Sequence, residues 1–343
     1  MPLPALLAAA ALAGAASLTG RAQAGSRASM TPAQAAAHKA RLVELLKGGR
    51  WRDALESNKA EAGRKLDLRG VDLTNADLND ANLTNADLND ANLIDADLTN
   101  ANLTGAKLSG AKLFGAWLSD ADLAYANLTN ADLTNADLRR ASLTNADLTD
   151  ANLTDANLTG AKLSGAKLSG ANLTDADLAY ANLTGASLTD ANLVNAKILW
   201  SGLCGANLTG TNLTNADLAY ANLTNANLTN ANLTDAGLSG ANLSDANLTG
   251  ADLASAELFS ANLTNANLTN ANLTGAKLFG AKLFGANLTG ANLTGATLEE
   301  VRLPEGFLAS STRVDAVPWT GTPFGWRAIA SPRGLRFFPI SKA

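Results

Sequence analysis

The chain reads Leu66-Asp67-Leu68-Arg69-Gly70-Val71-Asp72-Leu73-Thr74-Asn75 at the start of a run of five-residue units. The run continues to residue 305 without an insertion or deletion. Leucine occupies every position whose number ends in 3 or 8 from Leu68 to Leu303, with Ile198 as the sole exception. Two places before it stands alanine or another small or aliphatic residue. This period of five residues decides the fold.

A five-residue period fits neither the 3.6-residue turn of an α-helix nor the two-residue alternation of a long strand. A helix would spread the leucines around its whole circumference and would contain many Asn, Thr, Asp and Gly residues, which are poorer helix formers than Ala or Leu. Internal repeats of this kind indicate a solenoid, in which each unit buries its apolar side by stacking on its neighbours.

The repeated unit, written A(D/N)LXX, resembles that of the pentapeptide-repeat family, and it covers most of the chain. The resemblance implies an all-β solenoid: a right-handed quadrilateral β-helix with four units to a coil and with the Leu and the preceding Ala pointing inward. Residues 66–305 then form about twelve coils, roughly 58 Å long at the spacing of β-strands. The last position of each unit is mostly Asn, Asp or Gly, which tolerate the positive φ of a tight corner.

Residues 1–29 are predicted to be a signal peptide or leader. An apolar run from Ala5 to Leu18 is followed by Ala22-Gln23-Ala24, which fits a cleavage site, and we therefore expect an exported or periplasmic protein rather than a cytoplasmic one. The first four residues, however, contain no Lys or Arg, and an alternative is that translation begins at Met30.

We expect both ends of the repeat to be covered. Residues 30–65 are predicted to form a helical N-terminal cap, with Thr31 and Gln34 as a capping box and Gly48-Gly49 as the stop of the first helix. A second helical piece is expected from Arg50 to Ala62. Residues 306–343 lose the repeat and are expected to form an irregular C-terminal cap, or a tail that joins two molecules in a homodimer, as the resemblance suggests.

One irregular stretch supplies the candidate partner surface. Residues twenty apart stack in a four-unit coil, so Trp200 is predicted to form an aromatic ladder with Tyr180 and Tyr220. Beside it, Lys197 is expected to lie between Asp177 and Asp217. Cross-strand pairs of these kinds contribute about 0.2–1 kcal/mol each, so the columns could simply stabilise the coil. Exposed aromatic residues beside charges are also typical anchors for a protein partner. A further pair, Phe259 and Phe279, is expected only to stack.

The charge pattern offers an alternative function. The segment from Leu66 to Leu303 holds 25 acidic and 11 basic residues, a net charge of −14. Acidic members of the family resemble DNA and bind type II topoisomerases such as gyrase. Duplex DNA carries about one charge per 1.7 Å, or about 34 over the expected length, far more than this segment. We therefore keep DNA mimicry as the alternative.

The sequence lacks the parts of an enzyme. With one His and one Cys it offers no catalytic triad and no clustered metal site, and we expect no catalytic residues, no cofactor and no metal. We also expect no direct contact with nucleic acid and no stable membrane span. The sequence thus predicts a non-enzymatic scaffold that binds an unidentified protein partner. Binding of ice or another surface by outward Thr and Asn residues is a more remote alternative.

Overall fold

The structure is a computed structural model that describes residues 31–54, 66–302, 326–331 and 334–339. The chain divides into two units, Met1–His38 and Lys39–Ala343. Among the described residues, no helix combines the length and the apolar character that a membrane span needs. The expected leader, residues 1–29, lies outside the described residues.

Helix α1 runs from Pro32 to Lys47 and has the predicted capping box at its start. The Thr31 N–H donates to Gln34 Oε1 (2.9 Å), and the Gln34 N–H donates to Thr31 Oγ1 (3.2 Å). At its end, Gly49 has a φ of 68° and its N–H donates to the Leu46 carbonyl. Because few residues other than glycine adopt this φ cheaply, the helix stops where the sequence predicts.

Residues 51–54 are also helical, and the rest of the predicted second helical piece lies outside the described residues. Leu42 and Leu46, on the last turns of α1, are fully buried and belong to the same hydrophobic cluster as the first leucines of the repeat. Nearby, the Lys47 ammonium lies 3.0 Å from an Asp72 carboxylate oxygen.

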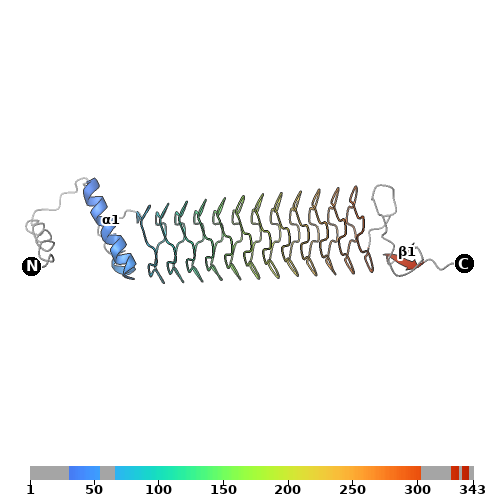
Figure 1. The fold of residues 1–343 in the computed structure, drawn as a ribbon, viewed down its shortest axis with the longest axis horizontal. Coiled ribbons are helices and arrows are strands. Elements are labelled where there is room, and N and C mark those ends of the chain that lie inside the picture. Colours follow the sequence, from blue (N-terminus) through green and yellow to red (C-terminus); the bar gives the residue numbers. More distant parts are fainter. Residues whose placement is uncertain (1–30, 55–65, 303–325, 332–333, 340–343) are drawn as a thin grey trace, which may run out of the picture. The chain divides into compact units, whose positions relative to one another are not determined.

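The repeat, residues 66–302, forms coils with a period of twenty residues (Figure 1). Each five-residue unit contributes one residue that forms a parallel β-bridge with the residues twenty before and twenty after it. At Lys197, for example, the N–H donates to the Ala176 carbonyl (2.9 Å) and the carbonyl accepts from Leu178 (2.7 Å). Within residues 66–302 the bridges stay isolated and no continuous strand forms, because a turn follows every bridged segment.

The turns explain the last position of each unit. The Ala181 N–H donates to the Leu178 carbonyl (3.0 Å), which closes a turn around Ala179 and Tyr180, and Tyr180 has a φ of 60°. A positive φ at the second central residue is the condition of a type II turn. It recurs at this position along the repeat, which is why Asn, Asp and Gly dominate there.

Inward Leu and Ala side chains form the core. Nearly all of them between Leu68 and Ala281 are at most 1% exposed. Two inward positions carry a hydroxyl, and both hydroxyls are satisfied: Ser201 Oγ donates to the Ile198 carbonyl (2.6 Å) and Thr211 Oγ1 donates to the Leu188 carbonyl (2.8 Å). The core therefore remains hydrogen-bonded where it departs from the pattern.

Outward Asn and Thr residues bond to each other in rows, and one row is unbroken over five coils. In it, each Thr hydroxyl donates to the Asn two residues earlier (2.6–2.7 Å), and each Asn amide donates to the Thr of the preceding coil (2.9–3.0 Å). We call this row the Asn–Thr zipper. Its members are Asn207, Thr209, Asn227, Thr229, Asn247, Thr249, Asn267, Thr269, Asn287 and Thr289. Asp could accept the hydroxyl but could not donate the second bond, so Asn completes the row where Asp would break it.

The C-terminal residues that the structure describes form a β-hairpin. Strand β1, Trp326–Ser331, pairs antiparallel with β2, Gly334–Pro339, so that Trp326 lies opposite Pro339 and Ser331 opposite Gly334. The prediction of an irregular tail was wrong for these residues. The aromatic and aliphatic residues of the two segments favour strands, but they lack the five-residue period on which the sequence reading relied.

We predict that Leu148→Ala will destabilise the repeat by about 2–5 kcal/mol, because it leaves a cavity under a fully buried side chain. Urea unfolding followed by circular dichroism measures this. Thr149→Ala, on the adjacent outward position, removes only the hydroxyl bond to Asp147 and should cost about 1 kcal/mol or less. Equal losses in the two variants would contradict an inward Leu column.

A second prediction concerns acid stability. Hydrogen bonds from the Arg69 side chain lower the pKa of Asp67 to about 2, and the hydroxyl of Thr74 is the main cause of a similar lowering at Asp72. A carboxyl with a folded pKa below its unfolded value of about 3.9 stabilises the folded state above that pH and loses this contribution as the pH falls toward 2.

The double variant D67N/D72N should therefore show a smaller decrease in urea midpoint between pH 4 and pH 2 than the natural chain. Asp155→Asn serves as the control, because Asp155 forms no ion pair within the described residues. A decrease as steep as that of the natural chain would contradict the prediction.

Candidate functional site

One side of the repeat differs from the others in chemistry, and we call it the ladder face. It consists of three columns: the bridged residue before an inward Leu, and the two turn residues after it. Six successive levels of the ladder face are each named by their bridged residue. These bridged residues are Asp177, Lys197, Asp217, Gly237, Glu257 and Lys277. The first turn column then holds Ala179, Leu199, Ala219, Ser239, Phe259 and Phe279, and the second holds Tyr180, Trp200, Tyr220, Gly240, Ser260 and Gly280.

Two of the three predicted ladder rings stack. The Trp200 and Tyr220 rings lie 4.3 Å apart between centroids at an angle of 12°. Tyr180 occupies the same column but has no ring contact within the described residues. Tyr180, Trp200 and Tyr220 are 63%, 52% and 53% exposed, so stacking leaves about half of each stacked side chain available.

Gly240 ends the stack. A Cβ atom built on Gly240 would lie 2.6 Å from two ring carbons of Tyr220, so the Tyr220 ring occupies the space that any other residue would fill. Gly205 has a similar φ, 65° against 68°, yet nothing lies within 4 Å of its Cβ position. At Gly240, therefore, the ring as well as the backbone requires glycine.

The predicted charge column is in place, but its charges do not pair. Lys197 forms β-bridges with Asp177 and Asp217, yet among the described residues its ammonium makes no ion pair. Both carboxylates instead accept backbone N–H groups, from Ala179 (2.9 Å) and Ala219 (3.0 Å). At the fifth and sixth levels of this face, by contrast, Lys277 Nζ lies 2.8 Å from a carboxylate oxygen of Glu257.

The sequence reading missed two members of this face. Phe259 and Phe279 are 36% and 42% exposed, and within the described residues neither has a ring contact, so the expectation that they merely stack was wrong. Together with the half-buried Leu199, they extend the apolar character of the ladder face beyond Tyr220. Their numbers differ from that of Leu199 by multiples of twenty, so the sequence itself places them in the same column, and this spacing could have identified them.

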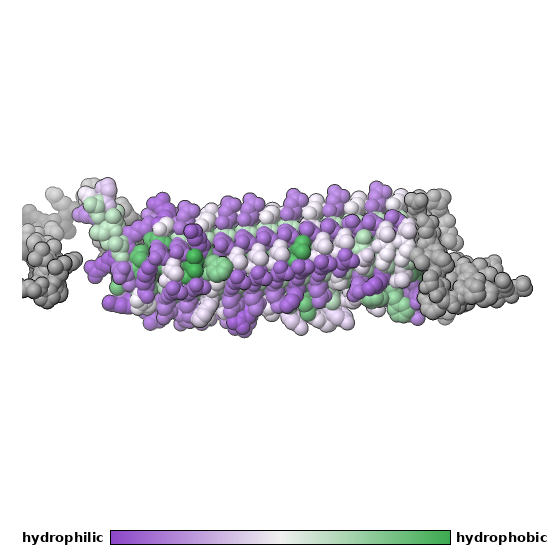
Figure 2. All heavy atoms as spheres, viewed as in Figure 1, coloured by the Kyte–Doolittle hydropathy of each residue, from purple (hydrophilic) through white to green (hydrophobic). Residues whose placement is uncertain are grey.

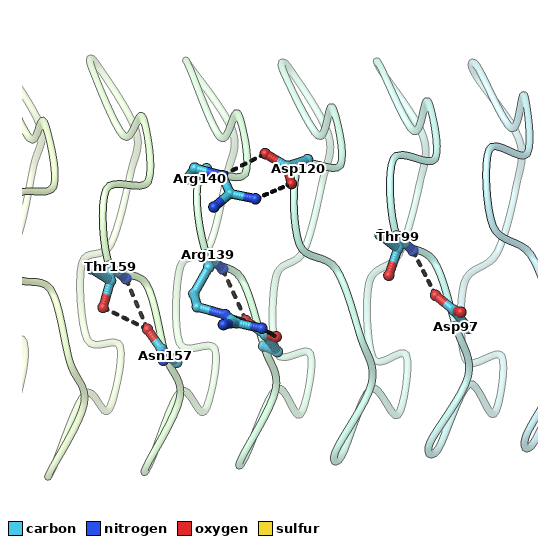
Figure 3. Close-up of polar contacts among 8 residues, drawn as sticks. Asp97, Thr99, Asp120, Arg139, Arg140, Asn157 and Thr159 are labelled. Carbon is cyan, nitrogen blue, oxygen red and sulfur yellow. Dashed lines mark hydrogen bonds and ion pairs between the residues drawn. The ribbon is translucent and has the colours of Figure 1, made fainter.

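Earlier levels of the same face carry charge (Figure 3). Arg139 bonds to Asp137 two residues earlier, with 2.8 Å between Nε and Oδ1. Arg140 reaches across one coil to Asp120, also at 2.8 Å between Nε and Oδ1. The Arg140 guanidinium lowers the pKa of Asp120. Both arginines are thus held by carboxylates of the same chain.

The ladder face contrasts with the polar rows. Figure 2 shows hydrophilic residues in rows along the repeat, with single hydrophobic residues between them. Within residues 31–54, 66–302 and the hairpin, no three His, Cys, Asp or Glu side chains gather as metal ligands would. Cys204 is a half-buried free thiol. The chemistry that the ladder face offers is contact: exposed rings, one aliphatic side chain and charges that remain open to a partner.

Comparison with known proteins places this geometry in a family. The family model described as pentapeptide repeats matches in eight copies, over residues 67–155 in overlapping segments, 156–195, 203–235, 236–275 and 276–305. A search of curated protein sequences gave no significant match.

Three solved structures are among those that the chain matches. HetL, a pentapeptide-repeat protein involved in heterocyst differentiation regulation in the cyanobacterium Nostoc sp. strain PCC 7120, is 34% identical. The match covers 74% of this chain and 97% of HetL, with a TM-score of 0.30. Rfr23 from the cyanobacterium Cyanothece 51142 is 36% identical over 33% of this chain and 87% of its own, with a TM-score of 0.22. QnrB1, a plasmid-mediated fluoroquinolone resistance protein, is 18% identical over 57% of this chain and 93% of its own, with a TM-score of 0.27.

The family model covers well over half of the sequence, and its repeats coincide with the bridged coils. The fold of residues 66–302 is accordingly a right-handed β-helical solenoid. The chain belongs to the pentapeptide-repeat family.

Proposed function

We propose that this protein is a non-enzymatic scaffold that binds a protein partner through the ladder face. The observation that carries the proposal is the gathering of exposed Tyr180, Trp200 and Tyr220 beside the unpaired charges of Asp177, Lys197 and Asp217. Tyr and Trp are enriched among residues that dominate binding energy, because they bury a large area and lose little conformational entropy.

The Asn–Thr zipper supports this assignment by contrast. Its hydroxyls and amides are used within the chain, so that a partner would have to break bonds that the coil already makes. On the ladder face a partner can bury ring edges without that cost. Since the backbone is the same on both sides, the difference lies in the side chains alone.

The two alternatives have less support. The first coils carry several Asp residues that form no ion pair within the described residues, which favours an acidic surface that mimics DNA and binds gyrase. The five Asn residues of the zipper, however, each donate a hydrogen bond that Asp could not donate, and they add no charge. Ice binding would need free outward hydroxyls, and the hydroxyls of the zipper donate to neighbouring amides.

Two further proposals concern the chain outside the ladder face. We propose that residues 30–65 cap the first coil, supported by the burial of Leu42 and Leu46. We propose that the tail, residues 306–343, caps the last coil or joins two copies. About twelve coils, export and cleavage of residues 1–29 remain predictions from the sequence.

The first test replaces the ladder rings. Y180N/W200N/Y220N keeps residues that tolerate a positive φ, since Asn already occupies this turn position at Asn225 with a φ of 57°. A photo-crosslinking amino acid at position 199 should trap a defined protein in native extracts, and the triple variant should reduce that product at least tenfold.

The matched control places the same crosslinker at position 229, in the zipper, where no comparable product is expected. Circular dichroism should show an unchanged fold for the triple variant. An equal yield from both positions, or an undiminished product from the triple variant, would contradict binding through the ladder face.

The second test uses the two glycines. Gly240→Ala should displace the Tyr220 ring and change the near-ultraviolet circular dichroism of the Trp200–Tyr220 stack, because its Cβ would lie 2.6 Å from ring carbons. Gly205→Ala imposes the same φ strain in open space and should leave the spectrum unchanged. Identical spectra for the two variants would show that only the positive φ of the backbone, and not the Tyr220 ring, requires glycine at position 240.

A further inference from the structure

The ladder face is complementary to itself when it is reversed. Its six levels from Asp177 to Lys277 are stacked at the spacing of β-strands, so they span about 29 Å including both ends. Pairing the first level with the sixth, the second with the fifth and the third with the fourth places unlike residues opposite each other in all three columns.

The symmetry that produces this pairing is a twofold axis. If two copies lie face to face and antiparallel, with the axis crossing the face midway between the Asp217 and Gly237 levels, each column meets the same column of the other copy. Contacts are then isologous, so every pair occurs twice.

The charges match under this operation. Asp177 of one copy faces Lys277 of the other, and Lys197 faces Glu257. Lys277 and Glu257 already pair within one chain at 2.8 Å, so the four groups form an alternating square of charges at each end. This arrangement also gives Lys197 the carboxylate that it lacks within the described residues of its own chain. Asp217, the remaining charge, faces Gly237 and meets no like charge.

The sizes match as well. In the second turn column the large Tyr180 and Trp200 face Gly280 and Ser260, whereas the space over Gly240 is filled by the Tyr220 ring of its own chain. In the first turn column Phe279 faces Ala179 and Phe259 faces Leu199, so the two exposed phenylalanines meet apolar residues. The Tyr220 ring leans over its own Gly240 and therefore lies beside the axis, next to its symmetry mate. Large residues opposite small ones are what close packing of two surfaces requires.

Gly237 is a residue that the fold does not demand. Its φ is not positive, and an added Cβ would make ordinary contacts of 3.5–3.9 Å with Asp217 and Ala216. Most bridged positions of the repeat carry Asn, Asp or Lys. At the centre of the reversed face, a glycine opposite Asp217 leaves room for that carboxylate.

We propose that the partner of the ladder face is a second copy of this chain, docked antiparallel about this axis. The inference rests on the proposed function, because it names an occupant for the same face. The contact covers one side of six coils, so it is small for a permanent dimer and belongs with weak, concentration-dependent interfaces.

The test is a charge-reversal cycle on the full chain, measured by sedimentation equilibrium between 5 and 500 µM. The natural chain should form dimers in this range. Lys197→Glu and Glu257→Lys should each raise the dimer dissociation constant at least tenfold, because each places two like-charge pairs in the interface.

The double variant K197E/E257K should return the constant to within about threefold of the natural value. Within one chain these positions are three coils, or about 14 Å, apart, so the recovery must come from contact between copies. Lys167→Glu, on a different side of the repeat, is the matched control and should leave association unchanged.

Three outcomes would overturn the inference: a natural chain that stays monomeric at 500 µM, a dimer indifferent to Lys197→Glu, or a double variant without recovery. A dimer indifferent to both charge changes would instead be joined elsewhere, as through the tail. If the chain is monomeric and position 199 still crosslinks a different protein, the self-association fails while the proposed function stands.

Discussion

The structure depends on one constraint: from Leu68 to Leu283, the N–H of each inward Leu, or of Ile198, donates to the carbonyl nineteen residues later, which fixes each coil in register with the next. With that register, inward Leu and Ala stack into a continuous core, and outward residues twenty apart form columns. A positive φ at the second turn residue turns the chain after each bridged segment. Since every unit obeys the same geometry, the backbone cannot distinguish one side of the solenoid from another. Whatever distinguishes the sides must come from the columns of outward side chains.

Those columns use the register in two ways. In the Asn–Thr zipper each Asn amide N–H donates to a Thr of the preceding coil, and its oxygen accepts from a Thr of its own coil. These outward polar groups therefore stabilise the stacking of the coils. The need for this donor accounts for Asn rather than Asp at five positions of the row, which add no negative charge. On the ladder face the same register brings together groups that cannot all satisfy each other: only two of three rings stack, and Lys197 stays without an ion pair in the described residues. The polar groups of the zipper are hydrogen-bonded within the chain, whereas the rings and charges of the ladder face remain available to another molecule.

The sequence predicted the features that follow from the register of the repeat and from local helix signals. The Leu and Ala core, the twenty-residue columns, the Thr31 capping box and the Gly49 stop of α1 are confirmed. What it could not predict depends on side-chain conformation. Whether Lys197 reaches Asp177 and whether Phe259 meets Phe279 are decided by rotamers, and in the turn columns these depend on which side chain the neighbouring coil presents. The hairpin of β1 and β2 was missed because its strands carry no five-residue period.

Departures from a repeat are informative when the fold does not require them. Gly240 is explained by the Tyr220 ring, and Ser201 and Thr211 are accommodated by hydrogen bonds to carbonyls of the core. Gly237, Leu199, Phe259 and Phe279 have no such explanation within one chain, and replacing each by the common polar residue would fit the coil at least as well. They all lie on the ladder face, at levels related by the proposed twofold axis. A residue that adds no stability to the fold and that the fold does not require indicates contact with another molecule. Because these residues are related by the twofold axis, a second copy of the chain is the simplest partner.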